Sequence, residues 1–212
     1  MTFKDRADAG TQLAERLNEF AGRDDVLLYA LPRGGVVVAA EVAKALKLPF
    51  DVIVTRKIAS PDNEEYAIGA LAETGETVWN EAERTGHDAK RVGEIVEKEK
   101  KEAVRRVKRY RQERPLPSFE GKTVVIIDDG VATGLTMQAA IEAAKHQHAA
   151  RIVVAVPHGA KESLAELRRI GAVIIALDEP EWYGAVGEFY ESFPQTSDDE
   201  VLALLKEFGP KT

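Results

Sequence analysis

The chain of 212 residues contains no cysteine. This absence excludes disulfide bonds, thiolate metal centres, iron–sulfur clusters and cysteine nucleophiles. Positive charge is also in short supply, because 29 lysines and arginines stand against 36 aspartates and glutamates, for a net charge of −7. No overall positive field therefore attracts nucleic acid or an anionic membrane, and any anionic ligand must be held by local groups.

Long hydrophobic runs are missing as well. No apolar stretch approaches the roughly 20 residues that span a bilayer, and the opening Met1–Arg6 is too polar for a signal peptide. These features predict a cytoplasmic protein without a membrane partner. The composition, with 44% hydrophobic and 31% charged residues, is that of a globular protein, and we expect a single domain over residues 1–212.

Short, β-branched apolar runs alternate with stretches of helical period. The runs are Val26–Ala30, Phe50–Thr55, Val124–Ile127, Ile152–Val156 and Val173–Leu177. This alternation predicts βαβ units, and the nearly continuous hydrophobicity of each run predicts a strand that is covered on both faces. The expected fold class is therefore α/β, with a mainly parallel five-stranded sheet flanked by helices.

Other segments surround this alternation. Helices are expected at Asp5–Phe20 and at Asp198–Phe208, the latter behind a Ser197 cap, and two short strands within Ile68–Asn80. Residues 81–114 are highly charged with a sparse apolar face, which predicts a helical insertion of one long helix or two. Its interleaved charges favour a solvated face with ion pairs one turn apart, and RNA binding or a subunit contact is the alternative.

The strongest indication of function is the segment Val124–Thr136. A buried strand ends in Asp128 and Asp129, a loop of small residues follows, and a helix begins near Thr133. Free N–H groups at a helix N-terminus bind phosphate, and carboxylates at the carboxyl end of a strand accept hydrogen bonds from ribose hydroxyls. This order of groups predicts a sugar-phosphate site, whereas an isolated acidic pair would more often cap a helix.

Three motifs resemble those of the type I phosphoribosyltransferase family. Val124–Thr136 resembles its signature for phosphoribosyl diphosphate (PRPP), Leu31–Gly35 its diphosphate loop, and Thr55–Lys57 its basic pair. The resemblance covers about Val26 to Leu177. Within the family, the combination of Pro32–Gly35, Thr55–Ile58 and Trp182–Gly187 resembles a bacterial group without an assigned base. The resemblance implies the type I fold, a small hood-like C-terminal element at residues 178–212, and a homodimer.

The resemblance also implies a chemistry. PRPP would bind with Mg²⁺, and its 5-phosphoribosyl group would pass to a nucleobase or related nitrogen nucleophile with release of diphosphate. The expected catalytic residues are Asp128 and Asp129, which hold the ribose hydroxyls directly or through Mg²⁺ and water, and Arg33 and Lys57, which face the diphosphate. The expected substrate-binding residues are Gly34, Gly35, Arg56, Gly130, Val131, Ala132, Thr133, Gly134, Leu135 and Thr136.

The acceptor is harder to predict. Ala132 stands where the 6-oxopurine branch of the family has an aspartate, which argues against hypoxanthine or guanine. A general acid or base could come from a loop at residues 58–75, and the alternative is that the carboxylates there are solvated; they are Glu64, Glu65 and Glu73.

The aromatic residues near the carboxyl terminus either stack on a base or pack in the core; they are Trp182, Tyr183, Phe189 and Tyr190. His158 is expected to be an exposed loop residue.

Two other functions stay open. One is a PRPP-sensing regulatory or RNA-binding protein on the same fold without catalysis, and the other is hydrolysis of PRPP or a nucleotide. The presence of Arg33, Lys57 and the acidic pair favours the transferase. The negative net charge and the lack of a recognisable nucleic-acid motif disfavour a nucleic-acid partner.

Overall fold

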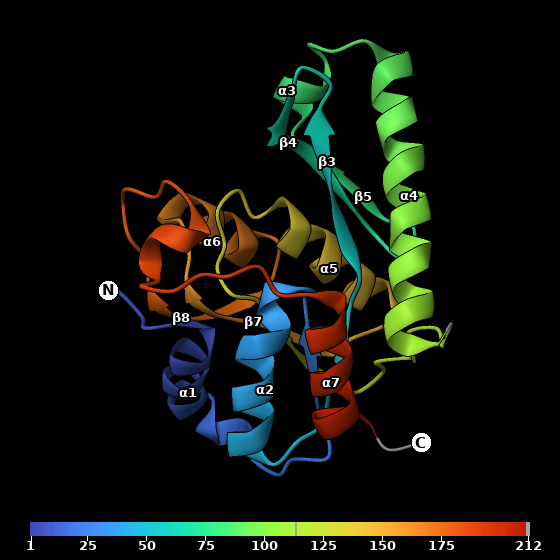
Figure 1. Cartoon of the computed structure of the whole chain (residues 1–212). Coiled ribbons are helices and arrows are strands. Elements are labelled where there is room, and N and C mark those ends of the chain that lie inside the picture. Colours follow the sequence, from blue (N-terminus) through green and yellow to red (C-terminus); the bar gives the residue numbers. More distant parts are fainter. Residues whose placement is uncertain (113, 211–212) are drawn as a thin grey trace.

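The structure is a computed structural model that describes residues 1–112 and 114–210. In this part of the chain, five parallel strands form a central sheet in the order β2-β1-β6-β7-β8 (Figure 1). The strands are β1 (Val26–Ala30), β2 (Phe50–Val52), β6 (Thr123–Ile127), β7 (Arg151–His158) and β8 (Val173–Asp178). The predicted fold class, an α/β protein with a five-stranded parallel sheet flanked by helices, is confirmed.

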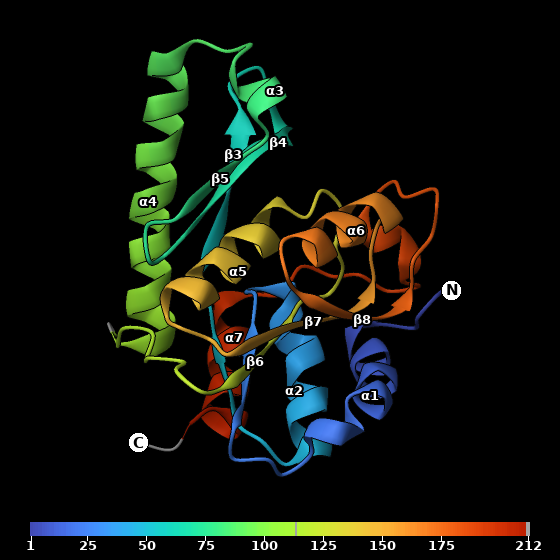
Figure 2. The ribbon, with the colours of Figure 1, turned by 180° about the vertical axis from the view of Figure 1, so that it is seen from behind.

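The central sheet separates two hydrophobic cores. Val125 and Ile127 of β6 belong to one core, and Val124 and Ile126 belong to the other, because successive side chains of a strand point to opposite faces. The first core also contains residues of α1 (Arg6–Arg16), α2 (Gly34–Leu46) and α7 (Asp198–Phe208), and it extends to the long helix of the insertion, α4 (Ala89–Arg111). The second takes in α5 (Leu135–His146) and α6 (Lys161–Arg169), so the sheet lies between two helical layers (Figure 2).

The expected opening and closing helices are both present. Asp5 caps α1 by accepting a hydrogen bond from the backbone N–H of Asp8, and a short 3₁₀ helix, η1 (Asn18–Phe20), follows α1. Ser197 and Glu200 form a capping box at the start of α7. A second 3₁₀ helix, η2 (Val186–Phe189), lies in the C-terminal segment that precedes α7.

A second sheet corrects two expectations. The predicted strand Phe50–Thr55 ends at Val52, and most of the expected loop at residues 58–75 is β-structure. Three antiparallel strands form this sheet, β3 (Thr55–Ser60), β4 (Asn63–Ala72) and β5 (Thr77–Trp79). Ile58, Ile68 and Leu71 join the core that contains residues of α4, whereas Ala67, Ala70 and Ala72 join the core that contains α5. The side chains therefore alternate with the period of a strand, but one face carries only small residues. Such a pattern is a weak indication of a strand in the sequence.

The helical insertion consists of a short helix and a long one. These are α3 (Glu81–Arg84) and α4 (Ala89–Arg111), and Asp88 caps α4 by accepting from the N–H of Arg91. Figures 1 and 2 show α4 standing beside the antiparallel sheet and extending well beyond the parallel one. Residues 113 and 211–212, which fall within the expected insertion and C-terminal element, lie outside the described residues. Within the described ranges, every helix is too short or too polar to cross a membrane.

Candidate functional site

The loop after β6 surrounds a cavity of about 220 Å³. Residues 128–137 line it, together with Lys57, Ala67 and Val186. Gly134 has φ of 76°, a left-handed conformation that suits glycine, and α5 begins directly after it. The first turn of α5 therefore forms part of the cavity wall, where free backbone N–H groups and the hydroxyls of Thr133 and Thr136 suit a phosphate.

The predicted diphosphate loop lies against the acidic pair. A Cβ on Gly34 would lie 1.8 Å from Asp129 Oδ2, and a Cβ on Gly35 would lie 2.8 Å from Asp128 Oδ1. Both separations are shorter than real side-chain carbons tolerate, so the two loops approach this closely only because both residues are glycine. Two motifs that are about 90 residues apart in the chain are thereby brought into contact.

Arg33 directly precedes these glycines. Its peptide bond with Pro32 is cis, and its side chain is 37% exposed. A guanidinium nitrogen of Arg33 lies 3.9 Å from Asp198 Oδ1 at the start of α7, and Asp198 also accepts hydrogen bonds from Tyr110 and Arg105. A partly exposed ion pair of that length contributes little free energy, and Arg33 is not among the residues that line the cavity of the acidic loop.

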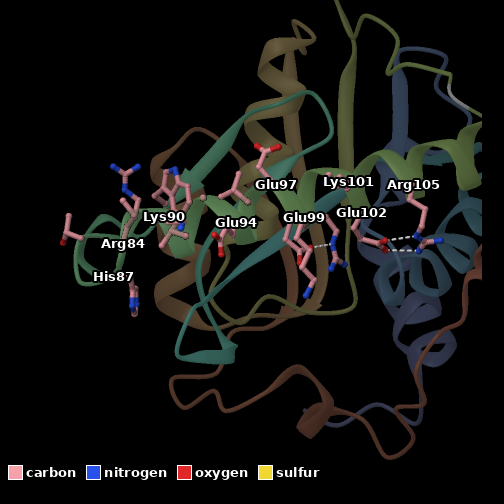
Figure 3. A pocket seen from close by; sticks show the side chains of 17 residues that line it. Arg84, His87, Lys90, Glu94, Glu97, Glu99, Lys101, Glu102 and Arg105 are labelled. Carbon is pink, nitrogen blue, oxygen red and sulfur yellow. Dashed lines mark hydrogen bonds and ion pairs between the residues drawn. The ribbon is translucent and has the colours of Figure 1, made fainter.

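The predicted basic pair is divided between the two faces of β3. Lys57 is paired with Ala70 in the antiparallel sheet and lines the cavity of the acidic loop. Arg56 is paired with Leu71, and its Nε donates a hydrogen bond to Glu99 Oε2 at 2.7 Å. Glu99 belongs to α4 and lies in a groove of about 1590 Å³ along that helix (Figure 3). Strand alternation thus places Lys57 at the site and turns Arg56 away from it.

A residue that the sequence interpretation missed holds one of the two carboxylates. Arg6 of α1 is only 8% exposed, and its Nε donates a hydrogen bond to Asp129 Oδ2 at 2.7 Å. An arginine in the first turn of an amphipathic helix normally indicates a solvated side chain, so no sequence signal distinguishes it. Only the packing of α1 against α2 reveals that Arg6 reaches the acidic loop.

The surroundings of Asp128 disfavour the charged form of its carboxyl group. Burial raises the pKa of Asp128 well above its ordinary value, and the negative charge of Asp129 raises that pKa further. The backbone N–H of Asp129 donates to Asp128 Oδ1 at 2.9 Å. A carboxylate in this position is stabilised by a cation or by hydroxyl donors.

Comparison with known proteins shows the family to which this arrangement belongs. A family model described as the phosphoribosyl transferase domain matches residues 3–193. The chain belongs to this family. Two relatives from Mycobacterium tuberculosis strains carry the provisional name phosphoribosyl transferase, and each is 43% identical over 205 residues, which is 96% of this chain and 46% of the relative. The chain spans about half the length of these curated relatives.

Solved structures place the phosphoribosyl transferase domain among known folds. A crystal structure of a protein from Thermus thermophilus has a TM-score of 0.79 and 38% identity, with 99% of this chain and 100% of that chain covered. A purine phosphoribosyltransferase from Pyrococcus horikoshii has a TM-score of 0.51 and 19% identity, with 92% and 97% covered. The second likeness shows a shared fold.

His158 corrects another expectation for this phosphoribosyl transferase domain. Instead of an exposed loop residue, it is fully buried, and it stacks on Phe189 with ring centroids 4.3 Å apart. Its Nδ1 lies 2.8 Å from the hydroxyl of Tyr183, and burial lowers the pKa of His158 to about 4. A Cβ on Gly130 would lie 2.6 Å from His158 Cε1, so the neutral imidazole packs directly behind the acidic loop.

The C-terminal aromatic residues divide between core and surface. Tyr183, Phe189 and Tyr190 all pack around His158, which favours the core interpretation for these three residues. Trp182 instead has 92% of its surface exposed. Its indole therefore forms no part of the buried aromatic cluster.

Glu73 was expected in an open loop, but its side chain is held in the interior. Its carboxylate pairs with the buried guanidinium of Arg111 at the end of α4, and it also accepts a hydrogen bond from the N–H of Val54 at 2.8 Å. A doubly held, buried carboxylate is unsuited to act as a mobile acid or base. Glu64 is exposed on β4, and the side chain of Glu65 lies outside the described part of the structure.

The charges of α4 are largely paired, as predicted. Lys100 contacts Glu97 at 2.8 Å, and Arg106 contacts Glu102 at 2.8 Å. Arg105 also contacts Glu102 (Figure 3). Arg109 contacts Asp199 of α7 at 2.7 Å. These neighbouring carboxylates reduce the positive potential that the helix would offer to RNA.

Proposed function

We propose that the chain binds PRPP with Mg²⁺ and transfers its 5-phosphoribosyl group to a nucleobase or related nitrogen nucleophile, releasing diphosphate. The observation that carries this proposal is the single cavity lined by the acidic pair, the loop as far as Thr136, and Lys57. Membership of the phosphoribosyl transferase domain family supports the same reaction.

The loop and helix hold the 5′-phosphate in this proposal. Backbone N–H groups of residues 130–136 and the hydroxyls of Thr133 and Thr136 donate hydrogen bonds to its oxygens. Because these residues form one wall of a small cavity, the phosphate fixes the position of the sugar. Asp128 then accepts hydrogen bonds from the ribose hydroxyls at the other end of the same loop.

The donor set at the cavity fits Mg²⁺. Two carboxylates line it, and the described residues include no denser cluster of three or more histidines or acids. Mg²⁺ takes few protein oxygens and keeps waters and substrate phosphate oxygens, so a pair suffices. Asp128 and Asp129 would hold it directly or through water. When bound, Mg²⁺ neutralises negative charge on the diphosphate.

The protein's own residues stabilise the positive charge on the ribose ring and the negative charge on diphosphate as they separate in the transition state. The C1–O bond of PRPP breaks, its electron pair leaves with diphosphate, and the acceptor nitrogen bonds to C1 and loses a proton. Asp128 stabilises the cationic ring of the transition state, while Lys57 and Arg33 stabilise the departing anion. Gly34 and Gly35 leave backbone groups accessible to that anion.

The acceptor in this proposal is neither hypoxanthine nor guanine. Ala132 lines the cavity and supplies no carboxylate to a base. A nucleobase that needs no acidic group from this loop fits such a site better. Ala132 itself cannot act as a catalytic acid or base.

A screen for diphosphate release tests the proposal. Wild-type protein with PRPP and Mg²⁺ is assayed against adenine, uracil, xanthine, orotate and simple amines. We expect release with at least one acceptor and none from Asp128→Asn, while Glu142→Gln, a change at an exposed carboxylate of α5, keeps full activity. Release that is independent of any acceptor indicates hydrolysis instead. If no acceptor gives diphosphate release although the protein binds PRPP tightly, the result indicates a PRPP-sensing regulatory protein without catalysis.

A further inference from the structure

Arg6 connects three parts of the chain that are distant in sequence. Its Nε donates to Asp129 Oδ2 at 2.7 Å, and its Nη1 donates to the carbonyl oxygen of Pro194, also at 2.7 Å. Its guanidinium carbon lies 3.7 Å from the centre of the Phe193 ring. One nearly buried cation on α1 therefore contacts both the acidic loop and the segment that precedes α7.

The C-terminal segment is fastened to the same loop at a second point. The hydroxyl of Tyr190 donates a hydrogen bond to the carbonyl oxygen of Asp129 at 2.6 Å. Four residues earlier, Val186 lines the candidate cavity beside residues 128–137. The position of this segment over the site thus depends on contacts made with the side chain and backbone of Asp129.

We propose that Arg6 is a positioning residue that makes the two adjacent carboxylates unequal. It fixes Asp129 as the anchor for the C-terminal segment, so that Asp129 meets the ligand only through water, and leaves Asp128 as the carboxylate that receives the ribose hydroxyls or Mg²⁺ directly. The inference rests on the proposed function, because it assigns the two carboxylates of the same site to different tasks.

The geometry around Asp129 supports this division. Asp129 Oδ2 is engaged by Arg6, and a Cβ on Gly34 would lie 1.8 Å from the same oxygen and 2.9 Å from Arg6 Nε. That oxygen is therefore enclosed on two sides. Asp128 Oδ1 accepts the backbone N–H of Asp129, and the Asp128 carboxyl also lies within hydrogen-bonding reach of the Asp129 side chain. No arginine holds Asp128 among the hydrogen bonds described, so its remaining lone pairs can accept further hydrogen bonds.

Arginine is suited to this role and lysine is not. The planar guanidinium donates in two directions within its plane while its face covers Phe193. A lysine ammonium could neutralise Asp129, but it cannot at once reach Pro194 and cover the ring. A positive charge alone is therefore insufficient to hold these three groups together. Arg6→Lys keeps the charge and removes the planar geometry, so it distinguishes the two contributions.

A double-mutant cycle with Asp129 tests the inference. Calorimetry measures the affinity of wild type, Arg6→Met, Arg6→Lys, Asp129→Asn and the double variant Arg6→Met/Asp129→Asn for PRPP with Mg²⁺. The affinity for ribose 5-phosphate without Mg²⁺ and the melting temperature are measured in parallel. Arg16→Met, a change at an exposed arginine near the other end of α1, is the matched control.

We expect Arg6→Met to weaken PRPP binding by about tenfold or more, because the acidic loop and the C-terminal segment lose their shared contact, and losses of this size are usual when a residue that supports a binding site from behind is removed. Arg6→Lys restores only part of the affinity, Arg16→Met leaves it unchanged, and Arg6→Met adds little once Asp129 is asparagine. Additive effects of the two substitutions overturn the inference. The inference is also overturned if Arg6→Met lowers the melting temperature but binds PRPP with wild-type affinity. If wild type itself binds no PRPP, the proposed function fails and the inference fails with it.

Discussion

Gly34 and Asp129 approach so closely that a methyl group on Gly34 would lie 1.8 Å from Asp129 Oδ2. Gly34→Ala therefore displaces either the acidic loop or the start of α2. We expect a loss of stability of about 1–3 kcal/mol, as overpacked positions show, and a loss of PRPP affinity. Denaturant unfolding and calorimetry measure the two effects.

Gly93 provides the matched control for this steric argument. It lies within α4, and a Cβ there would meet no other atom within 4 Å. We expect Gly93→Ala to stabilise the protein by about 0.5–1 kcal/mol, because glycine in a helix interior loses more backbone entropy on folding. Equal effects of the two substitutions would contradict the close approach at Gly34.

The charge of Asp128 opposes folding at neutral pH. Because the folded protein raises the pKa of this carboxyl, the folded state binds its proton more tightly than the unfolded chain does. Stability from this group is thus present at acid pH and is lost as the pH rises above the unfolded pKa. We expect Asp128→Asn to stabilise the ligand-free protein near neutral pH, with a gain that shrinks on acidification. Unfolding measured across that pH range checks the trend, and a gain that grows with acidity would refute it.

His158 gives the opposite pH dependence. Burial lowers its pKa from about 6.5 to about 4, so the unfolded chain takes up a proton before the folded protein does. Stability from this group is complete above the unfolded pKa, and about 3 kcal/mol is lost as the pH falls toward the folded pKa. We expect His158→Gln to show a shallower decline over the same range. Parallel curves for variant and wild type would show that His158 does not cause the loss.

The pair of Glu73 and Arg111 joins the β4–β5 turn to the end of α4. Both side chains are almost fully enclosed, so removal of one leaves a buried charge without its partner. We expect Glu73→Gln to cost about 3–5 kcal/mol, and Glu73→Leu/Arg111→Met to cost less than the single change. Denaturant unfolding compares the two variants. A double variant that is less stable than the single one would contradict this explanation.

Parts of the fold and site that depend on local pattern could be predicted from the sequence. The strand before Asp128 is continuously apolar, and the small residues that follow predict the phosphate loop without reference to the rest of the chain. The observed strand Thr123–Ile127 and helix from Leu135 agree with this prediction. The cap at Ser197 and the helix that follows it are likewise local features.

Features that depend on tertiary packing could not be predicted in this way. Arg56 and Lys57 look equivalent as neighbours in the sequence, but an unrecognised strand, β3, sends them to opposite faces. Arg6 and His158 look like surface residues, and only the packing of α1 and of the C-terminal segment buries them. Burial of a polar side chain leaves no periodic trace in the sequence.

The most direct test of the central claim is calorimetry of the wild-type protein with PRPP and Mg²⁺, paired with a melting curve. The account predicts saturable binding that Asp128→Asn abolishes. Ligand at about 100 times its dissociation constant is expected to raise stability by about 2.7 kcal/mol. Absence of both heat and stabilisation, with PRPP and with ribose 5-phosphate, would contradict the account.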